Sequence, residues 1–125
     1  MTVEPIRDKT KIKQMYHLLK GKDEKYALLF KFGLNTGLRI SDIIPLKVKD
    51  IMSPNMKFQD YLIIKEKKTG KEKKIKLNDS LKKLIMEYVK TNRLTYESYL
   101  FPSKKGNYIG RIQAYRVLKE CAEVL

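Results

Sequence analysis

Hydrophobic positions fall at helical spacing near both ends of the chain and alternate like a strand in the middle. Residues 8–20 are predicted to form a first helix, because apolar residues recur there at i, i+3, i+4 and i+7. This apolar stripe consists of Ile12, Met15, Tyr16 and Leu19. Residues 26–34 are nearly continuous apolar sequence interrupted by Lys31, which predicts a second helix largely buried in a core. Asp8 and Asp23 stand where side-chain caps of these two helices are expected.

A turn is predicted where the second helix ends. Asn35, Thr36 and Gly37 are turn residues, because Asn and Gly tolerate the positive φ with which a helix stops and the chain reverses. A second apolar run follows, and it consists of Ile43, Ile44, Leu46 and Val48. Pro45 lacks an amide hydrogen and is best tolerated in a first turn, so the helix in this run must be short. Arg39 is therefore expected between two buried helices.

A guanidinium held near a core needs an anionic partner, since unpaired buried charge is costly. Asp42, three residues after Arg39, offers a local ion pair that would fix the corner. A phosphate is the alternative, because the planar fork of arginine grips it through two parallel hydrogen bonds. The chemistry of the residues alone favours the ion pair.

Between residues 50 and 77 the spacing of apolar residues changes from that of a helix to every second residue. Residues 61–65 and 73–77 predict two strands joined by a turn at 68–71, and residues 50–52 are a candidate third strand. The fold class expected is therefore α+β, mainly helical with a small antiparallel two- or three-stranded sheet. Residues 57–76 contain eight lysines and only three acidic residues. A solvated edge hairpin explains a few of these lysines, whereas eight favour an arm that lies against phosphates.

Two further helices are expected after the hairpin. Asn78, Asp79 and Ser80 form a capping sequence before an apolar stripe over residues 81–89. The last helix begins near Arg111, and its apolar stripe is still in phase at Leu125 without a stop signal. We therefore expect a chain cut within a longer sequence.

The charge balance indicates a polyanionic partner. The formal net charge is +14 in 125 residues, with 28 Lys and Arg against 14 Asp and Glu, which favours nucleic acid. An anionic membrane is disfavoured, since no apolar run approaches the span of a bilayer. Cys121, the only cysteine, excludes a disulfide framework, and His17, the only histidine, is interpreted as a surface residue. No signal peptide is visible at the start, so a cytoplasmic protein is expected.

Four short motifs together resemble the tyrosine recombinases of the phage integrase family. Residues 36–39 read Thr-Gly-Leu-Arg and are followed by Asp42, as in the family's first arginine box. Residues 68–70 read Lys-Thr-Gly in the hairpin that carries the family's catalytic lysine. Residues 100–102 read Leu-Phe-Pro, and residues 113–116 read Gln-Ala-Tyr-Arg at a helix start.

The resemblance implies site residues and partners. Arg39 would stabilise charge on a phosphate and Lys68 would protonate the 5′-oxygen leaving group, with Asp42 in support. Lys67 or Lys71 competes with Lys68 for that role, because one sequence does not fix the turn register. The predicted DNA-binding lysines are Lys65, Lys67, Lys71, Lys73 and Lys74. The implied partners are double-stranded DNA and further recombinase protomers, with no metal, cofactor, membrane or small-molecule substrate.

The family's second half has no counterpart here. His17 is not followed by an arginine three residues on, so there is no His-x-x-Arg box, and no tyrosine stands where the family's nucleophile would. Residues 1–125 are therefore expected to be a single domain, the truncated N-terminal part of an integrase catalytic domain, that binds DNA without cleaving it. A non-catalytic DNA-binding module and a ribosomal-type RNA-binding protein remain alternatives.

Overall fold

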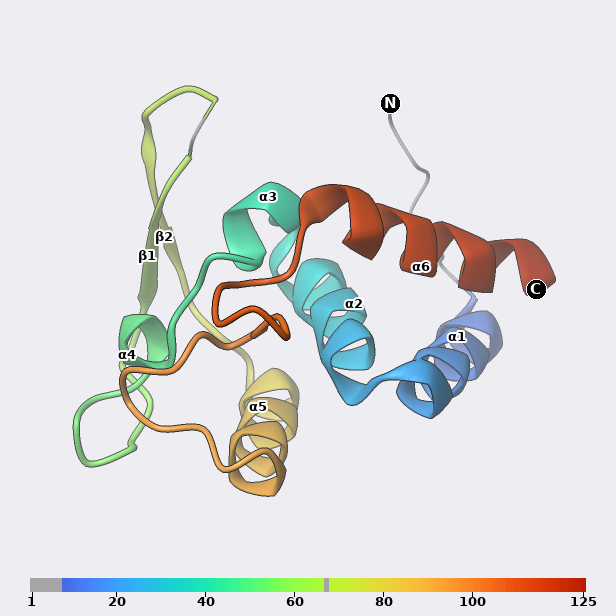
Figure 1. The fold of residues 1–125 in the computed structure, drawn as a ribbon. Helices are drawn as coiled ribbons and strands as arrows, with labels where there is room; N and C mark the ends of the chain where they lie inside the picture. Colours follow the sequence, from blue (N-terminus) through green and yellow to red (C-terminus); the bar gives the residue numbers. More distant parts are fainter. Residues whose placement is uncertain (1–7, 67) are drawn as a thin grey trace.

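The computed structural model describes residues 8–66 and 68–125. In chain order its elements are α1 (Lys9–Lys22), α2 (Glu24–Thr36), α3 (Ile40–Ile43), α4 (Val48–Ile51), β1 (Leu62–Lys65), β2 (Glu72–Ile75), α5 (Asp79–Thr91) and α6 (Arg111–Val124). Figure 1 shows α2 in the middle of the helical part and the hairpin of β1 and β2 at its left side. This α+β architecture, mainly helical with a small antiparallel sheet, confirms the predicted fold class.

Helix α2 forms the centre of the core because it is apolar on most sides. It packs against α1, α3, α5 and α6. Its buried residues are Tyr26, Ala27, Leu28, Leu29 and Phe32. A helix with so wide an apolar surface must be covered by neighbours on several faces, as the sequence predicted.

The predicted caps of the first two helices are confirmed. The carboxylate of Asp8 accepts a hydrogen bond from the N–H of Thr10 at 2.9 Å. Asp23 caps α2 in the same way, through the N–H of Lys25. Helix α1 runs two residues past the predicted end at residue 20 and includes Gly21 before it stops at Asp23.

The apolar run after the corner forms two separate short helices. Pro45 lies between α3 and α4, where its missing N–H prevents a continuous helix. The candidate third strand at residues 50–52 is wrong, because Asp50 and Ile51 belong to α4. Asp50 caps that helix by accepting a hydrogen bond from the N–H of Lys47, and Met52 forms only an isolated bridge with Phe58.

The two predicted strands form one antiparallel hairpin with shifted ends. Leu62 pairs with Ile75, and Lys65 pairs with Glu72. Leu62 and Ile64 on the inner face are buried, while Ile63 on the outer face is 62% exposed. This alternation is the period of two that the sequence predicted.

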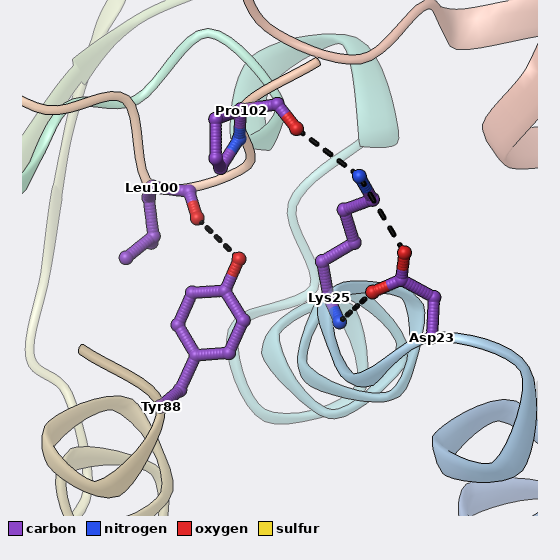
Figure 2. A network of polar contacts seen from close by, with 5 residues as sticks. All are labelled: Asp23, Lys25, Tyr88, Leu100 and Pro102. Atoms are coloured by element: carbon purple, nitrogen blue, oxygen red, sulfur yellow. Dashed lines mark hydrogen bonds and ion pairs between the residues drawn. The ribbon is translucent and has the colours of Figure 1, made fainter. Parts of the chain in front are cut away.

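The segment between α5 and α6 is fastened to the rest of the fold by polar contacts. Figure 2 shows the hydroxyl of Tyr88 donating to the carbonyl of Leu100 at 2.7 Å, and Lys25 Nζ donating to the carbonyl of Pro102 at 3.1 Å. Lys25 Nζ also lies 3.5 Å from a carboxylate oxygen of Asp23. These bonds hold residues 100–102 against α2 and α5.

Candidate functional site

The corner between α2 and α3 is built to reverse the chain within three residues. Gly37 has φ +71°, and its N–H donates to the carbonyl of Gly33 at 2.9 Å. The hydroxyl of Thr36 donates to the carbonyl of Phe32 and accepts from the N–H of Leu38. Leu38 is buried, so the turn is anchored on both sides of the glycine.

Arg39 lies at this corner with an exposed side chain. Its backbone is extended, and its carbonyl accepts hydrogen bonds from the N–H groups of Asp42 and Ile43 at the start of α3. The expectation that Arg39 is held near the core is wrong, because the neighbours Leu38 and Ile43 turn inward while the arginine turns to solvent.

The local ion pair between Arg39 and Asp42, which the chemistry of the residues alone favoured, is not formed among the described residues. Within residues 8–66 and 68–125, no ion pair joins the guanidinium of Arg39 to Asp42 or to another carboxylate. Asp42 is 7% exposed and lies on the buried side of α3. The guanidinium therefore keeps its five N–H donors for an external anion. A supporting role for Asp42 remains a prediction.

A second arginine lies at the same corner. Ser41 and Ile44 of the α3 turn, together with Tyr108, Gly110 and Arg111, line a hollow of about 440 Å³. Helices α3 and α6 are in contact here. The hollow joins segments that are about 70 residues apart in the sequence, so no local pattern could have predicted it.

Arg111 stands at an unusual position for a cation. It is exposed at the first position of α6, after Gly110, which makes no side-chain cap. A positive charge at a helix N-terminus opposes the helix dipole, and the first turn of α6 contains no acidic residue. This local mismatch in the sequence singles out Arg111, whereas the apolar pattern alone predicted only a helix start there.

The hairpin tip presents Lys68 and Lys71 to solvent. Gly70 has φ +71°, and its N–H donates to the carbonyl of Glu66 at 2.8 Å, which closes the turn. Lys68 is exposed within this turn. Arg39 lies in a different part of the fold, at the corner between α2 and α3. The two predicted catalytic side chains thus come from separate elements, and their shared role remains a prediction.

The other predicted DNA-binding lysines differ in their surroundings. Lys65 and Lys74 lie on the outer face, where Lys74 Nζ is 4.3 Å from the centre of the Tyr61 ring. Lys73 lies on the inner face, and its Nζ is 3.6 Å from a carboxylate oxygen of Glu66. The predicted role of Lys67 falls outside the described residues.

The buried tyrosines are poor candidates for a nucleophile. Burial raises the pKa of the Tyr88 hydroxyl well above its usual range, and that hydroxyl is already engaged with Leu100. Burial, followed by the charge of Asp23, also raises the pKa of Tyr26. Both groups keep their protons at neutral pH, as expected for tyrosines that belong to the core.

The described residues contain neither a cluster of metal-binding side chains nor a helix that could cross a membrane. No group of three or more His, Cys, Asp or Glu side chains within residues 8–66 and 68–125 is placed to hold a metal ion. Across the same residues, every helix is too short or too polar to cross a membrane.

The chain is similar in sequence to known recombinases. A sequence model described as the phage integrase family matches residues 7–124. The "Probable integrase/recombinase YoeC" of Bacillus subtilis (strain 168) is 44% identical over 121 residues, which are 96% of this chain and 63% of that protein. The "Putative tyrosine recombinase TTE1313" of Caldanaerobacter subterraneus subsp. tengcongensis is 27% identical over 82% of this chain and 35% of that protein. The chain thus spans about a third to two thirds of the length of these relatives.

Solved structures show the same fold at low identity. The structure of XerA recombinase aligns with a TM-score of 0.70 and 15% identity over 98% of this chain and 43% of that one. Lambda integrase (residues 75-356) bound to DNA aligns with a TM-score of 0.72 and 16% identity, over 98% of this chain and 44% of that one. A lambda integrase tetramer bound to a Holliday junction aligns with a TM-score of 0.71 and 16% identity over 93% and 33% of the two chains. The match of the family model over almost the whole length, together with the 44% identity to the Bacillus protein, shows that this chain belongs to the phage integrase family.

Proposed function

We propose that this chain is the front part of a tyrosine recombinase catalytic domain, and that it binds double-stranded DNA in the cytoplasm for strand cleavage and rejoining. The observation that carries the proposal is the exposed Arg39, which projects from an anchored corner and has no ion-pair partner in the described part of the chain. A cation held in this way is ready to meet a phosphate without first breaking an internal contact.

In this proposal Arg39 and Lys68 contribute different chemistry. The guanidinium of Arg39 donates two parallel hydrogen bonds to non-bridging phosphate oxygens and stabilises the negative charge that develops there. Lys68 gives a proton to the 5′-oxygen as that oxygen leaves the phosphorus. Asp42 supports the corner from the buried side of α3. The phosphorus is attacked by a tyrosine hydroxyl, so that a phosphotyrosine bond replaces the broken phosphodiester bond.

The hairpin and the corner bind the DNA backbone. Lys65, Lys71 and Lys74 are exposed and have no ion-pair partner within residues 8–66 and 68–125. Lys73 first has to leave Glu66, whose side chain is 13% exposed, so this partly shielded ion pair competes with a phosphate for Lys73. Arg111 adds a further cation beside the corner. DNA in two of the similar structures, one of them a tetramer, supports duplex DNA and further protomers as partners.

The chain by itself is proposed to bind DNA without cleaving it. In-line attack needs a tyrosine opposite the leaving oxygen and enough cations to neutralise the phosphate. The sequence holds one histidine and no His-x-x-Arg motif, and Tyr88 and Tyr26 are buried with raised pKa values. In this proposal the nucleophile and the remaining cations come from residues outside this sequence.

The test is to translate the reading frame of the source gene past Leu125 and to express the protein that it encodes. A His-x-x-Arg motif followed by a tyrosine is expected there. That longer protein is expected to form a covalent adduct with a nicked DNA substrate, while residues 1–125 bind the same DNA without an adduct. Arg39→Ala and Lys68→Ala are each expected to lower adduct formation by a factor of about 10² to 10³. A stop codon directly after Leu125 would withdraw the enzyme proposal.

A non-catalytic DNA-binding module is the second candidate, and it is favoured by the absence of the second motif from this sequence. It predicts that lysine substitutions in the hairpin weaken DNA binding, while Arg39→Ala changes no chemistry in any longer protein. Competition between duplex DNA and a folded RNA of equal length separates both candidates from an RNA-binding protein. Preference for the RNA would contradict both.

A further inference from the structure

A second basic surface lies on the helical side of the molecule. Helices α1, α2 and α5 enclose a groove of about 560 Å³ whose polar lining residues include Lys9, Lys13, His17, Lys31, Ser80 and Lys83. Four of these six side chains are lysines that come from three different helices. The fold therefore gathers into one concave surface cations that are up to 74 residues apart in the sequence.

The charges in this groove are not compensated. The ion pairs of the described residues are Lys22 with Glu120, Lys25 with Asp23, Lys49 with Glu97 and Lys73 with Glu66. None of them includes a lysine of the groove, and Glu87 is the only carboxylate in its lining. Like charges that converge in a concavity repel one another and focus a positive potential, which an anionic ligand relieves.

The spacing of the groove residues suits a ligand with repeated charges. Lys9, Lys13 and His17 follow one another at intervals of four residues along α1, and each interval is about 6 Å of helix rise. Lys83 faces them from α5. Two lysines and a histidine along one wall and a further lysine on the other match a chain of phosphates better than a single anion.

The floor of the groove favours contact with the backbone over contact with bases. Tyr16 is the aromatic residue of the lining, and its ring is approached by Lys31 Nζ at 5.3 Å and by Lys20 Nζ at 5.9 Å. Both ammonium groups lie within about 6 Å of the ring centre and compete with a base for stacking on this ring. The groove is therefore equipped for phosphates, which report no sequence.

The groove is separate from the proposed site of cleavage. Figure 1 shows α1 at the right of the view and the hairpin at the left, with α2 between them. None of the residues that line the groove belongs to the hairpin, to the Arg39 corner or to the hollow at Arg111. A ligand in this groove is bound by a different set of residues from the DNA at the hairpin.

We propose that this groove binds the phosphate backbone of a second DNA segment, distinct from the segment at the hairpin and the Arg39 corner. The inference rests on the proposed function, because DNA is the polyanion that a recombinase holds close at hand. The two surfaces let one chain contact two stretches of duplex at once. The contacts are independent of sequence and fall with rising salt, since each phosphate neutralised releases a counterion.

The test uses double variants of residues 1–125 that remove equal charge from the same helices. Lys13→Gln with Lys83→Gln changes the groove, and Lys11→Gln with Lys90→Gln changes exposed lysines of α1 and α5 outside it. A third variant, Lys71→Gln with Lys74→Gln, changes the hairpin. Thermal unfolding of each variant confirms that all three fold.

One duplex is fixed to a bead and saturated with protein, and the retention of a second, labelled duplex is measured. The wild type and the Lys11/Lys90 variant are expected to retain the second duplex. The Lys13/Lys83 variant is expected to bind it about 60-fold more weakly in 0.1 M salt, with a salt slope smaller by about 1.8, which corresponds to two lost phosphate contacts. Equal retention by the groove and control variants, or no retention by the wild type, would overturn the inference.

The hairpin variant keeps this inference and the proposed function apart. Loss of binding to the fixed duplex in the Lys71/Lys74 variant supports the proposed DNA contact, whatever the groove variant does. Unchanged binding of the fixed duplex in that variant would contradict the proposed hairpin contact instead. Binding of a polyglutamate peptide is measured as well. If the Lys13/Lys83 variant loses binding of this peptide but keeps binding of the second duplex, the groove is a docking site for an acidic protein segment, contrary to the inference.

Discussion

Replacing Arg39 with alanine tests whether the arginine stabilises the corner or binds a phosphate. The side chain is exposed and has no ion-pair partner within residues 8–66 and 68–125. The turn is held instead by Gly37, Thr36 and the buried Leu38. Removal of an exposed, unpaired side chain changes stability by no more than about 0.5 kcal/mol. For a domain of this size that corresponds to a change in Tm of about 2 °C or less.

The same substitution is expected to change DNA binding in a defined way. Loss of one phosphate contact lowers the slope of log Kobs against log salt concentration by about 0.9, which is about an eightfold loss of affinity in 0.1 M salt. Arg39→Lys is expected to restore the slope, because it keeps the charge, but not the geometry of the two-pronged contact. Lys90→Ala, which removes an exposed cation from α5, is the control and is expected to leave the slope unchanged.

The two measurements refute different parts of the reasoning. A fall in Tm of more than about 8 °C in Arg39→Ala would mean that the arginine stabilises the corner by about 2 kcal/mol, which contradicts its exposed and unpaired position. An unchanged salt slope with an unchanged Tm would mean that no phosphate reaches Arg39. Either outcome would remove the observation on which the proposed function rests.

Three further predictions concern the frame that holds the site. Gly37→Ala is expected to lower Tm by about 4 °C, because alanine at φ +71° costs about 1 kcal/mol, whereas Gly21→Ala inside α1 is expected to stabilise by about 0.4–1 kcal/mol; thermal unfolding of both variants checks the pair. Tyr88→Phe leaves the buried carbonyl of Leu100 without its donor and is expected to cost about 1–3 kcal/mol in urea unfolding, and an unchanged midpoint would contradict the bond in Figure 2. Burial raises the pKa of Tyr88 and of Tyr26 in the folded protein above the unfolded value of 10.0. The contribution of these two groups to the free energy of unfolding is therefore fully present below pH 10 and is lost as the pH rises above it. The free energy of unfolding is therefore expected to fall by up to about 1.4 kcal/mol per pH unit for each tyrosine above pH 10, and less steeply in Tyr88→Phe.

Local signals in the sequence predicted most of the helices because those signals act over a few residues. Asp8, Asp23 and Asn78 each accept the backbone hydrogen bond that an N-cap requires, and Gly37 adopts the left-handed conformation that ends α2. The apolar stripe of α5 is buried as its spacing predicted. These features depend on the order of neighbouring residues, which one sequence supplies.

The failed predictions depend on which side of an element faces the core. Residues 50–52 alternate like a strand, but Asp50 caps a helix, and the preference of a single cap outweighed the short alternation. Arg39 follows apolar sequence, yet its side chain turns outward because the chain reverses at Gly37. The direction of one side chain at a turn is fixed by the backbone angles of its neighbours, and hydrophobic periodicity does not report them.

The approach of Arg111 to the Arg39 corner depends on contacts between distant segments. The N–H of Leu100 donates to the carbonyl of Leu46 at 2.8 Å, and the N–H of Ile109 donates to the carbonyl of Phe101 at 3.0 Å. These bonds tie the start of α6 to the chain that follows α3. No local pattern predicts such pairings, because each partner is equally suited to water or to another strand until the whole fold forms.

The residues around Arg39 are packed into the core, whereas the arginine itself is exposed. Leu38 and Ile43 on either side of Arg39 are buried, and the bonds of Tyr88 and Lys25 hold residues 100–102 against α5 and α2, as Figure 2 shows. No described carboxylate pairs with the guanidinium of Arg39. In the proposed function, a phosphate therefore pairs with this guanidinium without first breaking an internal ion pair. The proposed role of Arg39 agrees with what catalysis by a preorganised site requires, namely hydrogen-bond donors that are in place before charge develops on the phosphate.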